Sequence, residues 1–141
     1  MRRSEIEDVS PNNWNEFMPQ IIKAGKELLI LSMISKQPMS GYDLIKKIYA
    51  ETNVLLSQGT LYPILYIFEG ASILKAQYEM GNIRTKIYRL TPQGREIAQD
   101  KIDNFIQALN HFIKLIDAEA SSRHMTNIHV LNLILDLDKS N

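Results

Sequence analysis

The sequence predicts a mainly α-helical protein with one small β-hairpin, an α+β fold class. Three observations support this prediction. Apolar residues recur at helical spacing in five stretches, one central stretch alternates apolar and polar residues around Gly81-Asn82, and Ser, Thr or Pro stands where several helices are expected to begin. The chain has 141 residues and is 45% apolar, which fits one globular domain with an appended arm.

Proline and serine set the expected boundaries of the first two helices. Residues 1–13 are expected to form a flexible tail, and a helical period begins at Trp14. Pro19 suits the first turn of the main helix, and the segment KQPMSG ends it, because the residue before a proline avoids the helical region. Ser40 is expected to cap a second helix over 41–52. Its inward-facing residues are predicted to be Tyr42, Leu44, Ile45 and Ile48.

A third helix is expected to begin at Ser57 or Gln58 and to end near Glu69 or Ala71. The segment ILKAQYEMGNIRTKIYRLT follows, in which apolar and polar residues roughly alternate on both sides of Gly81-Asn82. This pattern is typical of two antiparallel strands joined by a tight turn.

Thr91 and Pro92 are expected to cap and open the longest helix. Its apolar residues recur in steps of four and three, which predicts a heptad-like seam. The seam comprises Ala98, Ile102, Phe105, Leu109, Phe112 and Ile116, with Ile106 and Ile113 on one flank. After a break at ASSRHMTN, a final short helix is expected within 123–139.

The composition excludes several classes of protein. The chain has no cysteine, so it forms no disulfide and has no thiolate chemistry. No apolar run approaches the roughly 20 residues that span a bilayer, and the N-terminal segment lacks the apolar core of a secretory signal. We therefore expect a cytoplasmic protein with no membrane partner.

No enzymatic site is expected. The sequence has neither a Gly-rich phosphate loop nor a nucleophile elbow. The histidines are His111, His124 and His129, and the spacing of the last two does not stack them on a helix as metal ligands require. We interpret them as surface or interface residues and expect no catalysis, no metal and no cofactor.

The net charge of zero conceals an uneven distribution. Residues 36–95 carry eight Lys or Arg against four Asp or Glu, whereas residues 1–35 carry four against five and residues 96–141 carry four against seven. A basic centre between acidic flanks indicates an anionic partner for the centre, although so few charges also reach this imbalance by chance.

Three helices followed by a hairpin form the winged helix-turn-helix arrangement. In this arrangement the third helix enters the DNA major groove, and the hairpin, or wing, reaches the flanking backbone or minor groove. We therefore expect a winged-helix domain over 14–95 and C-terminal dimerisation helices over 96–141.

Three blocks of the sequence resemble the PadR family of transcriptional regulators. They are ILSMISKQPMSGYDLIKKI (Ile30–Ile48), GTLYPILYIFE (Gly59–Glu69) and KIYRLTPQGRE (Lys86–Glu96), in the family's order and near its spacing. The resemblance implies a dimeric DNA-binding repressor, often released by a small molecule, with a C-terminal helical dimerisation region.

Two positions depart from the family pattern. Ser72 stands where the family usually has a glycine after the recognition helix, whereas Gly70 comes two residues earlier, so the helix is expected to end early or to bend. The segment MGNIRT replaces a longer basic, glycine-rich loop, which predicts a short wing.

The segment SQGTLYPIL at the start of the third helix carries the main predicted DNA contacts. Gly59 has no side chain, so the helix N-terminus and its backbone N–H groups can approach a phosphate closely. Gln58 and Thr60 carry donors and acceptors that can read base edges, and the hydroxyls of Ser57 and Tyr62 suit phosphate contacts. The alternative is an ordinary amphipathic helix with a solvated polar face.

Basic side chains supply the other predicted DNA contacts. Arg84 and Lys86 follow the hairpin turn and share one strand face, and Arg84 is the best candidate for the minor groove or a phosphate. Arg89 lies on the opposite face, where it can instead pair with a carboxylate. Further phosphate candidates, which equally fit a solvated surface, are Lys36, Lys46 and Lys47.

A homodimer is expected to form through the seam of the long helix. The predicted interface residues are Ile102, Phe105, Leu109, Phe112, Ile116, Trp14 and Phe17. A cleft between the aromatic residues of this set could hold a small aromatic effector. Core packing between the first and fourth helices explains the same residues, and we prefer that interpretation.

The predicted function is a sequence-specific regulator that binds double-stranded DNA, most simply a homodimeric repressor on a palindromic operator. The alternative is a dimeric winged-helix module that binds a protein partner without specific DNA binding, which a net charge of zero allows.

Overall fold

The computed structural model describes residues 13–119. The expected helix within 123–139, His124, His129 and nearly all of the expected N-terminal tail lie outside the described residues. The chain divides into two compact units, Met1–Gln99 and Asp100–Asn141. The division falls inside the longest helix, near residue 96, where the C-terminal region is predicted to begin.

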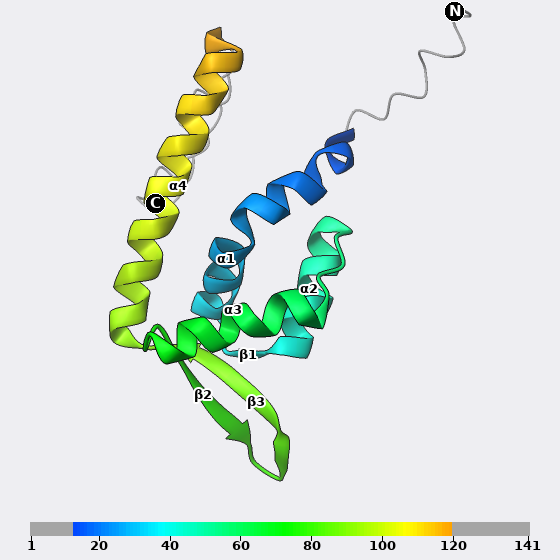
Figure 1. Cartoon of the computed structure of the whole chain (residues 1–141), viewed down its shortest axis with the longest axis vertical. Helices are drawn as coiled ribbons and strands as arrows, with labels where there is room; N and C mark the ends of the chain where they lie inside the picture. Colours follow the sequence, from blue (N-terminus) through cyan, green and yellow to red (C-terminus); the bar gives the residue numbers. More distant parts are fainter. Residues whose placement is uncertain (1–12, 120–141) are drawn as a thin grey trace, which may run out of the picture. The chain divides into compact units, whose positions relative to one another are not determined.

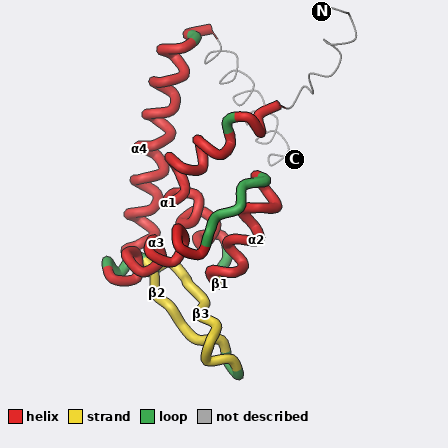
Figure 2. The backbone as a smooth tube through the Cα atoms, turned by 45° about the vertical axis from the view of Figure 1, so that its right-hand side comes forward, coloured by secondary structure: helices red, strands yellow, loops and turns green. Residues whose placement is uncertain are grey.

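The first unit contains the expected helices and hairpin. In chain order the elements are η2 (Asn13–Glu16), α1 (Met18–Lys36), β1 (Met39–Ser40), α2 (Gly41–Thr52), α3 (Gln58–Gly70), β2 (Leu74–Glu79), β3 (Asn82–Leu90) and α4 (Pro92–Ile116), which continues into the second unit. Figures 1 and 2 show β2 and β3 projecting together beyond α2 and α3. The predicted fold class, mainly α with a small β-hairpin, is confirmed.

Short polar side chains cap three of the helices. Asp43 N–H donates to Ser40 Oγ at 3.1 Å, and Ser40 N–H donates to Asp43 Oδ2 at 3.4 Å, which makes a reciprocal capping box for α2. Thr60 N–H donates to Ser57 Oγ at 3.2 Å at the start of α3. Gly94 N–H donates to Thr91 Oγ1 at 2.8 Å at the start of α4. These caps fix the helix starts where the sequence predicts them.

The sheet has a third strand that the sequence analysis did not predict. Its order is β1-β3-β2, with both pairs antiparallel. Met39 pairs with Tyr88, and Ser40 pairs with Ile87. Two residues are too short a strand to show a periodic pattern, so β1 is defined only by its partner. This pairing holds the start of α2 against the wing.

The core of the first unit is built from the apolar faces of its helices. Helix α3 contributes four buried apolar residues, namely Leu61, Ile64, Leu65 and Phe68. The prediction that Tyr42 faces inward is wrong, since 62% of this residue is exposed. Tyr42 lies in the first turn of α2, where Lys46 Nζ stands 4.5 Å from its ring centroid. The ring therefore packs against a lysine at the surface rather than in the core.

The start of α4 is attached to the segment that follows α3. Thr91 Oγ1 donates to the Ser72 carbonyl at 2.7 Å, and a Cβ on Gly94 would collide with the carbonyl of Ile73. Helix α3 ends at Gly70, and Ser72 has a φ of +59°, in the left-handed region that favours glycine. This backbone conformation gives a physical reason for a glycine at that position.

The described part of the second unit is residues 100–119, most of which belong to α4. Ile102 and Phe105 are half-buried, whereas Leu109, Phe112 and Ile116 are 39%, 58% and 68% exposed. The predicted seam therefore forms an apolar face that stays partly open to solvent in the single chain. Within residues 13–119, no helix combines the length and apolar character needed to cross a membrane.

Candidate nucleic-acid interface

The N-terminus of α3 is an exposed polar surface on a buried apolar base. Ser57, Gln58 and Gly59 are exposed and Thr60 is half-buried, while the opposite side of the helix lies in the core. Ser57 Oγ donates to Thr60 Oγ1 at 3.0 Å and accepts from Thr60 N–H. The two hydroxyls thus form one polar cluster, and Gln58, which lies between them in the sequence, is exposed.

Gly59 is not required by packing within the chain. The nearest atom to a Cβ built on this residue is Ser57 Oγ at 3.9 Å, which is an ordinary contact distance. Alanine is favoured over glycine by about 1 kcal/mol inside a helix, so folding alone favours a side chain here. The absence of a side chain leaves the backbone at this helix terminus open to a ligand.

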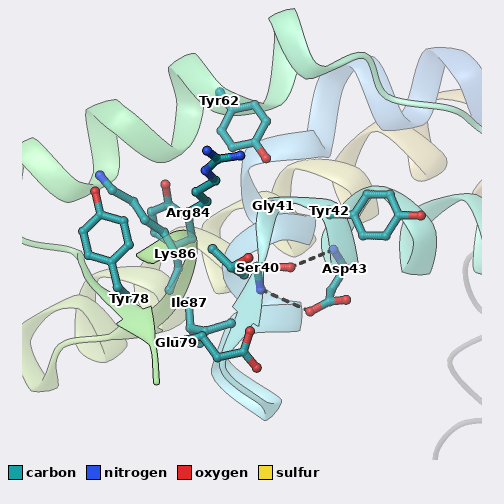
Figure 3. A pocket seen from close by; sticks show the side chains of 12 residues that line it. Ser40, Gly41, Tyr42, Asp43, Tyr62, Tyr78, Glu79, Arg84, Lys86 and Ile87 are labelled. Atoms are coloured by element: carbon teal, nitrogen blue, oxygen red, sulfur yellow. Dashed lines mark hydrogen bonds between the residues drawn. The ribbon is translucent and has the colours of Figure 1, made fainter. Parts of the chain in front are cut away.

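A groove of about 830 Å³ is lined by residues of β1, α2, α3 and the hairpin. Its walls include Gly41 of α2, Tyr62 of α3, and Tyr78, Arg84 and Lys86 of the hairpin. Figure 3 shows the Arg84 side chain reaching toward the Tyr62 ring, and Gly41 lies against the same ring. The structure therefore brings together three predicted contacts, Tyr62, Arg84 and Lys86, that come from different parts of the sequence.

The cations of the hairpin differ in their surroundings. Lys86 Nζ lies 3.9 Å from Glu69 Oε2 and 5.8 Å from the centroid of the Tyr78 ring. Arg84 is exposed on the same strand. The carboxylate partner considered for Arg89 is not found among the described residues, where Arg89 is exposed and makes no ion pair.

Tyr88 forms part of the wall at the base of the groove and is 5% exposed. Burial raises the pKa of its hydroxyl, and the nearby Glu69 carboxylate raises that pKa further. The Tyr88 phenol is therefore protonated and uncharged at neutral pH.

The other predicted phosphate contacts, Lys36, Lys46 and Lys47, do not themselves line the groove, although Lys46 contacts two residues that do. Lys46 Nζ is 3.6 Å from Asp43 Oδ1 and also faces the Tyr42 ring. Lys47 is half-buried, and Lys36 is exposed at the last residue of α1.

A model of the PadR-like family of transcriptional regulators matches residues 30–100, which is half of the chain. The chain belongs to this family. The matched segment contains β1, α2, α3, the hairpin and the start of α4, so it includes every residue that lines the groove. No curated protein sequence matches the chain.

Solved structures of other PadR regulators share this fold. A PadR-like regulator from Bacillus cereus has a TM-score of 0.60 and 22% identity, over 70% of this chain and 97% of its own. A PadR family regulator from Eggerthella lenta has a TM-score of 0.63 and 21% identity, over 81% of this chain and 97% of its own. A PadR family regulator from Clostridium difficile has a TM-score of 0.53 and 28% identity, over 63% of this chain and 98% of its own.

The sequence did not identify Gly41, Tyr78 and Tyr88 as residues that line the groove. Gly41 is next to the predicted cap Ser40 and resembles an ordinary helix start, and Tyr78 and Tyr88 resemble ordinary strand residues. Gly41 and Tyr88 come to the groove through the pairing of β1 with β3, and Tyr78 comes to it through the pairing of β2 with β3. In the part of the chain that the structure describes, no cluster of three His, Cys, Asp or Glu side chains is arranged to hold a metal ion.

Proposed function

We propose that this PadR-like regulator is a homodimeric repressor that binds a palindromic DNA operator. The observation that carries the proposal is the exposed polar N-terminus of α3 beside a groove that contains Tyr62, Arg84 and Lys86. A helix with polar residues at its N-terminus fits the major groove. Cations on a neighbouring hairpin fit the backbone or the minor groove.

Within this proposal, Gln58 and Thr60 read bases, and the other polar groups hold the DNA backbone. The Gln58 amide has both a donor and an acceptor, which matches the paired acceptor and donor of adenine. Ser57, Gly59 and the backbone of the first turn of α3 offer N–H and hydroxyl donors to a phosphate. Lys36, Lys46 and Lys47 are proposed as weaker, peripheral phosphate contacts.

The dimer is proposed to form through the apolar seam of α4. Leu109, Phe112 and Ile116 are too exposed to be ordinary core residues of a monomer. A two-fold dimer places two copies of α3 symmetrically, and this symmetry is the physical reason to expect a palindromic operator. Trp14, Phe17, Ile102 and Phe105 are the remaining proposed interface residues.

A small aromatic effector is a secondary part of the proposal. Phe17 and Phe112 are 60% and 58% exposed, so their rings offer aromatic surface in the single chain. Burial by the partner subunit accounts for the same rings and stays our preferred interpretation. Trp14 is the chain's one tryptophan, so quenching of its fluorescence by added benzoate or salicylate would show an effector site near it.

Salt dependence of DNA binding tests the proposal directly. Fluorescence anisotropy of a labelled duplex, measured at several salt concentrations, gives the slope of log affinity against log salt. The slope is about −0.9 for each phosphate that the protein neutralises, so about three contacts per subunit give a slope near −5. A flat response, or passage through heparin without retention, would overturn DNA binding in favour of a protein-binding module.

A further inference from the structure

Gly41 and Tyr62 make a close contact between the first turn of α2 and the exposed face of α3. A Cβ placed on Gly41 would stand 2.8 Å from Cε1, Cζ and Oη of Tyr62. Carbon atoms that are not bonded to each other pack at about 3.5–4.0 Å. The ring of Tyr62 therefore occupies space that only a glycine at position 41 leaves open.

This contact determines where the Tyr62 hydroxyl lies. Tyr62 is 42% exposed, so its ring rests on Gly41 on one side and is open to solvent on the other. Arg84 comes from β3 and lines the same groove, and Figure 3 shows its side chain extending toward the Tyr62 ring. A phenol donor and a guanidinium thus converge from two elements on one open space.

We propose that the groove binds one phosphodiester of the DNA backbone and that Gly41 is the positioning residue of this site. Gly41 seats Tyr62 so that its hydroxyl and the Arg84 guanidinium contact the same phosphate. The inference rests on the proposed DNA-binding function. Phosphate oxygens accept hydrogen bonds from hydroxyl and guanidinium donors, and guanidinium contacts are strengthened by charge.

The carboxylates on the groove weaken the site only at its edge. Asp43 is held by the Ser40 N–H at 3.4 Å and by Lys46 Nζ at 3.6 Å, so its charge is already partnered. Glu79 is exposed at the end of β2. An anion in the groove is therefore expected between Tyr62 and Arg84 rather than at the Glu79 end.

A double-mutant cycle on the full chain tests the inference. Binding of a fluorescein-labelled duplex of mixed sequence at low salt is measured for the wild type, Gly41→Ala, Tyr62→Phe and the double variant. Each single change is expected to weaken binding about tenfold, because each removes one hydrogen bond to a charged group. The double variant should bind about as well as either single one, because both changes act through the same contact.

Gly70→Ala provides the matched glycine control. Gly70 is exposed at the end of α3, and a Cβ there has no neighbouring atom within 4 Å. This variant should bind like the wild type. Thermal unfolding of Gly41→Ala should stay close to that of the wild type, since the exposed Tyr62 ring can rotate into solvent.

Several results would overturn the inference. Unchanged binding by Tyr62→Phe, which keeps the ring and the fold, is sufficient by itself. Unchanged binding by a folded Gly41→Ala variant would also overturn it. So would a loss of DNA affinity on Gly41→Ala that is equal in the wild type and in Tyr62→Phe. If the wild type does not bind the duplex at all, the proposed function fails and the inference fails with it. Failure of the inference alone is distinguishable from failure of the proposed function, because the wild type still binds DNA in the first case.

Discussion

Lys86 Nζ lies 3.9 Å from Glu69 Oε2, so a cation of the hairpin is paired with a carboxylate of α3. The two side chains are 40% and 37% exposed. Solvent therefore screens the pair, and exposed pairs of this kind contribute at most about 1 kcal/mol to stability. The main consequence is electrostatic: a negative charge stands beside a predicted DNA contact.

Glu69→Gln is expected to tighten DNA binding several-fold at low salt. The change removes a charge that repels phosphate and releases Lys86 to contact it, so the salt slope should steepen by up to about one per subunit. Anisotropy titrations at several salt concentrations measure both effects. Glu27→Gln, at an exposed position on α1, is the control with the same charge change. An equal gain for both variants would show that only net charge matters.

Gly59→Ala is expected to separate folding from DNA binding. The position has room for a Cβ, so the free energy of unfolding should stay the same or rise by up to about 1 kcal/mol. DNA affinity should fall about tenfold or more, because the methyl group keeps the helix N-terminus away from a phosphate. Chemical denaturation and anisotropy provide the two measurements. Wild-type affinity in a folded variant would remove Gly59 from the interface.

Gln58→Ala and Arg84→Ala are expected to differ in their dependence on sequence. Loss of the Gln58 amide should cost about 1–3 kcal/mol on the operator and almost nothing on scrambled DNA. Loss of Arg84 should weaken both duplexes about equally and reduce the salt slope by about one. The operator would first be located by genome-wide binding and footprinting. Equal weakening of both duplexes by Gln58→Ala would make α3 a backbone clamp, with specificity coming from DNA shape.

Leu109→Asp combined with Phe112→Asp is expected to abolish the dimer. The two side chains are 39% and 58% exposed in the single chain, so the changes are tolerated in a monomer but bury unpaired charge in a dimer interface. Light scattering should report a monomer. Lys101→Asp, at an exposed position on the same helix, provides the control for an added negative charge. A double variant that remains a stable dimer would show that the seam is not the interface.

Gly94→Ala is expected to destabilise the first unit by several kcal/mol. A Cβ at this position collides with the carbonyl of Ile73, and neither backbone can move away easily. Thr91→Ala should cost about 1 kcal/mol, because it removes the cap of α4 and the bond to the Ser72 carbonyl. Thermal unfolding measures both changes. A Gly94→Ala variant as stable as the wild type would contradict the close approach.

The sequence by itself determined the features that depend on neighbouring residues. The starts of α2, α3 and α4 were predictable because Ser40, Ser57 and Thr91 bond to backbone groups three residues away. The hairpin was predictable from alternation around a glycine, and Gly81 indeed has a φ of +83°. The polar start of α3 was also evident, because Leu61, Ile64, Leu65 and Phe68 share the other face, which is buried.

The tertiary structure decided which distant residues meet. Strand β1 exists only because Met39 and Ser40 pair with β3. The contact of Gly41 with Tyr62 and the pairing of Lys86 with Glu69 each join separate elements. Periodicity records which face of an element is apolar, but it carries no information about the atoms that another element brings to that face. For this reason the groove, unlike the helices that form it, was not predictable from the sequence.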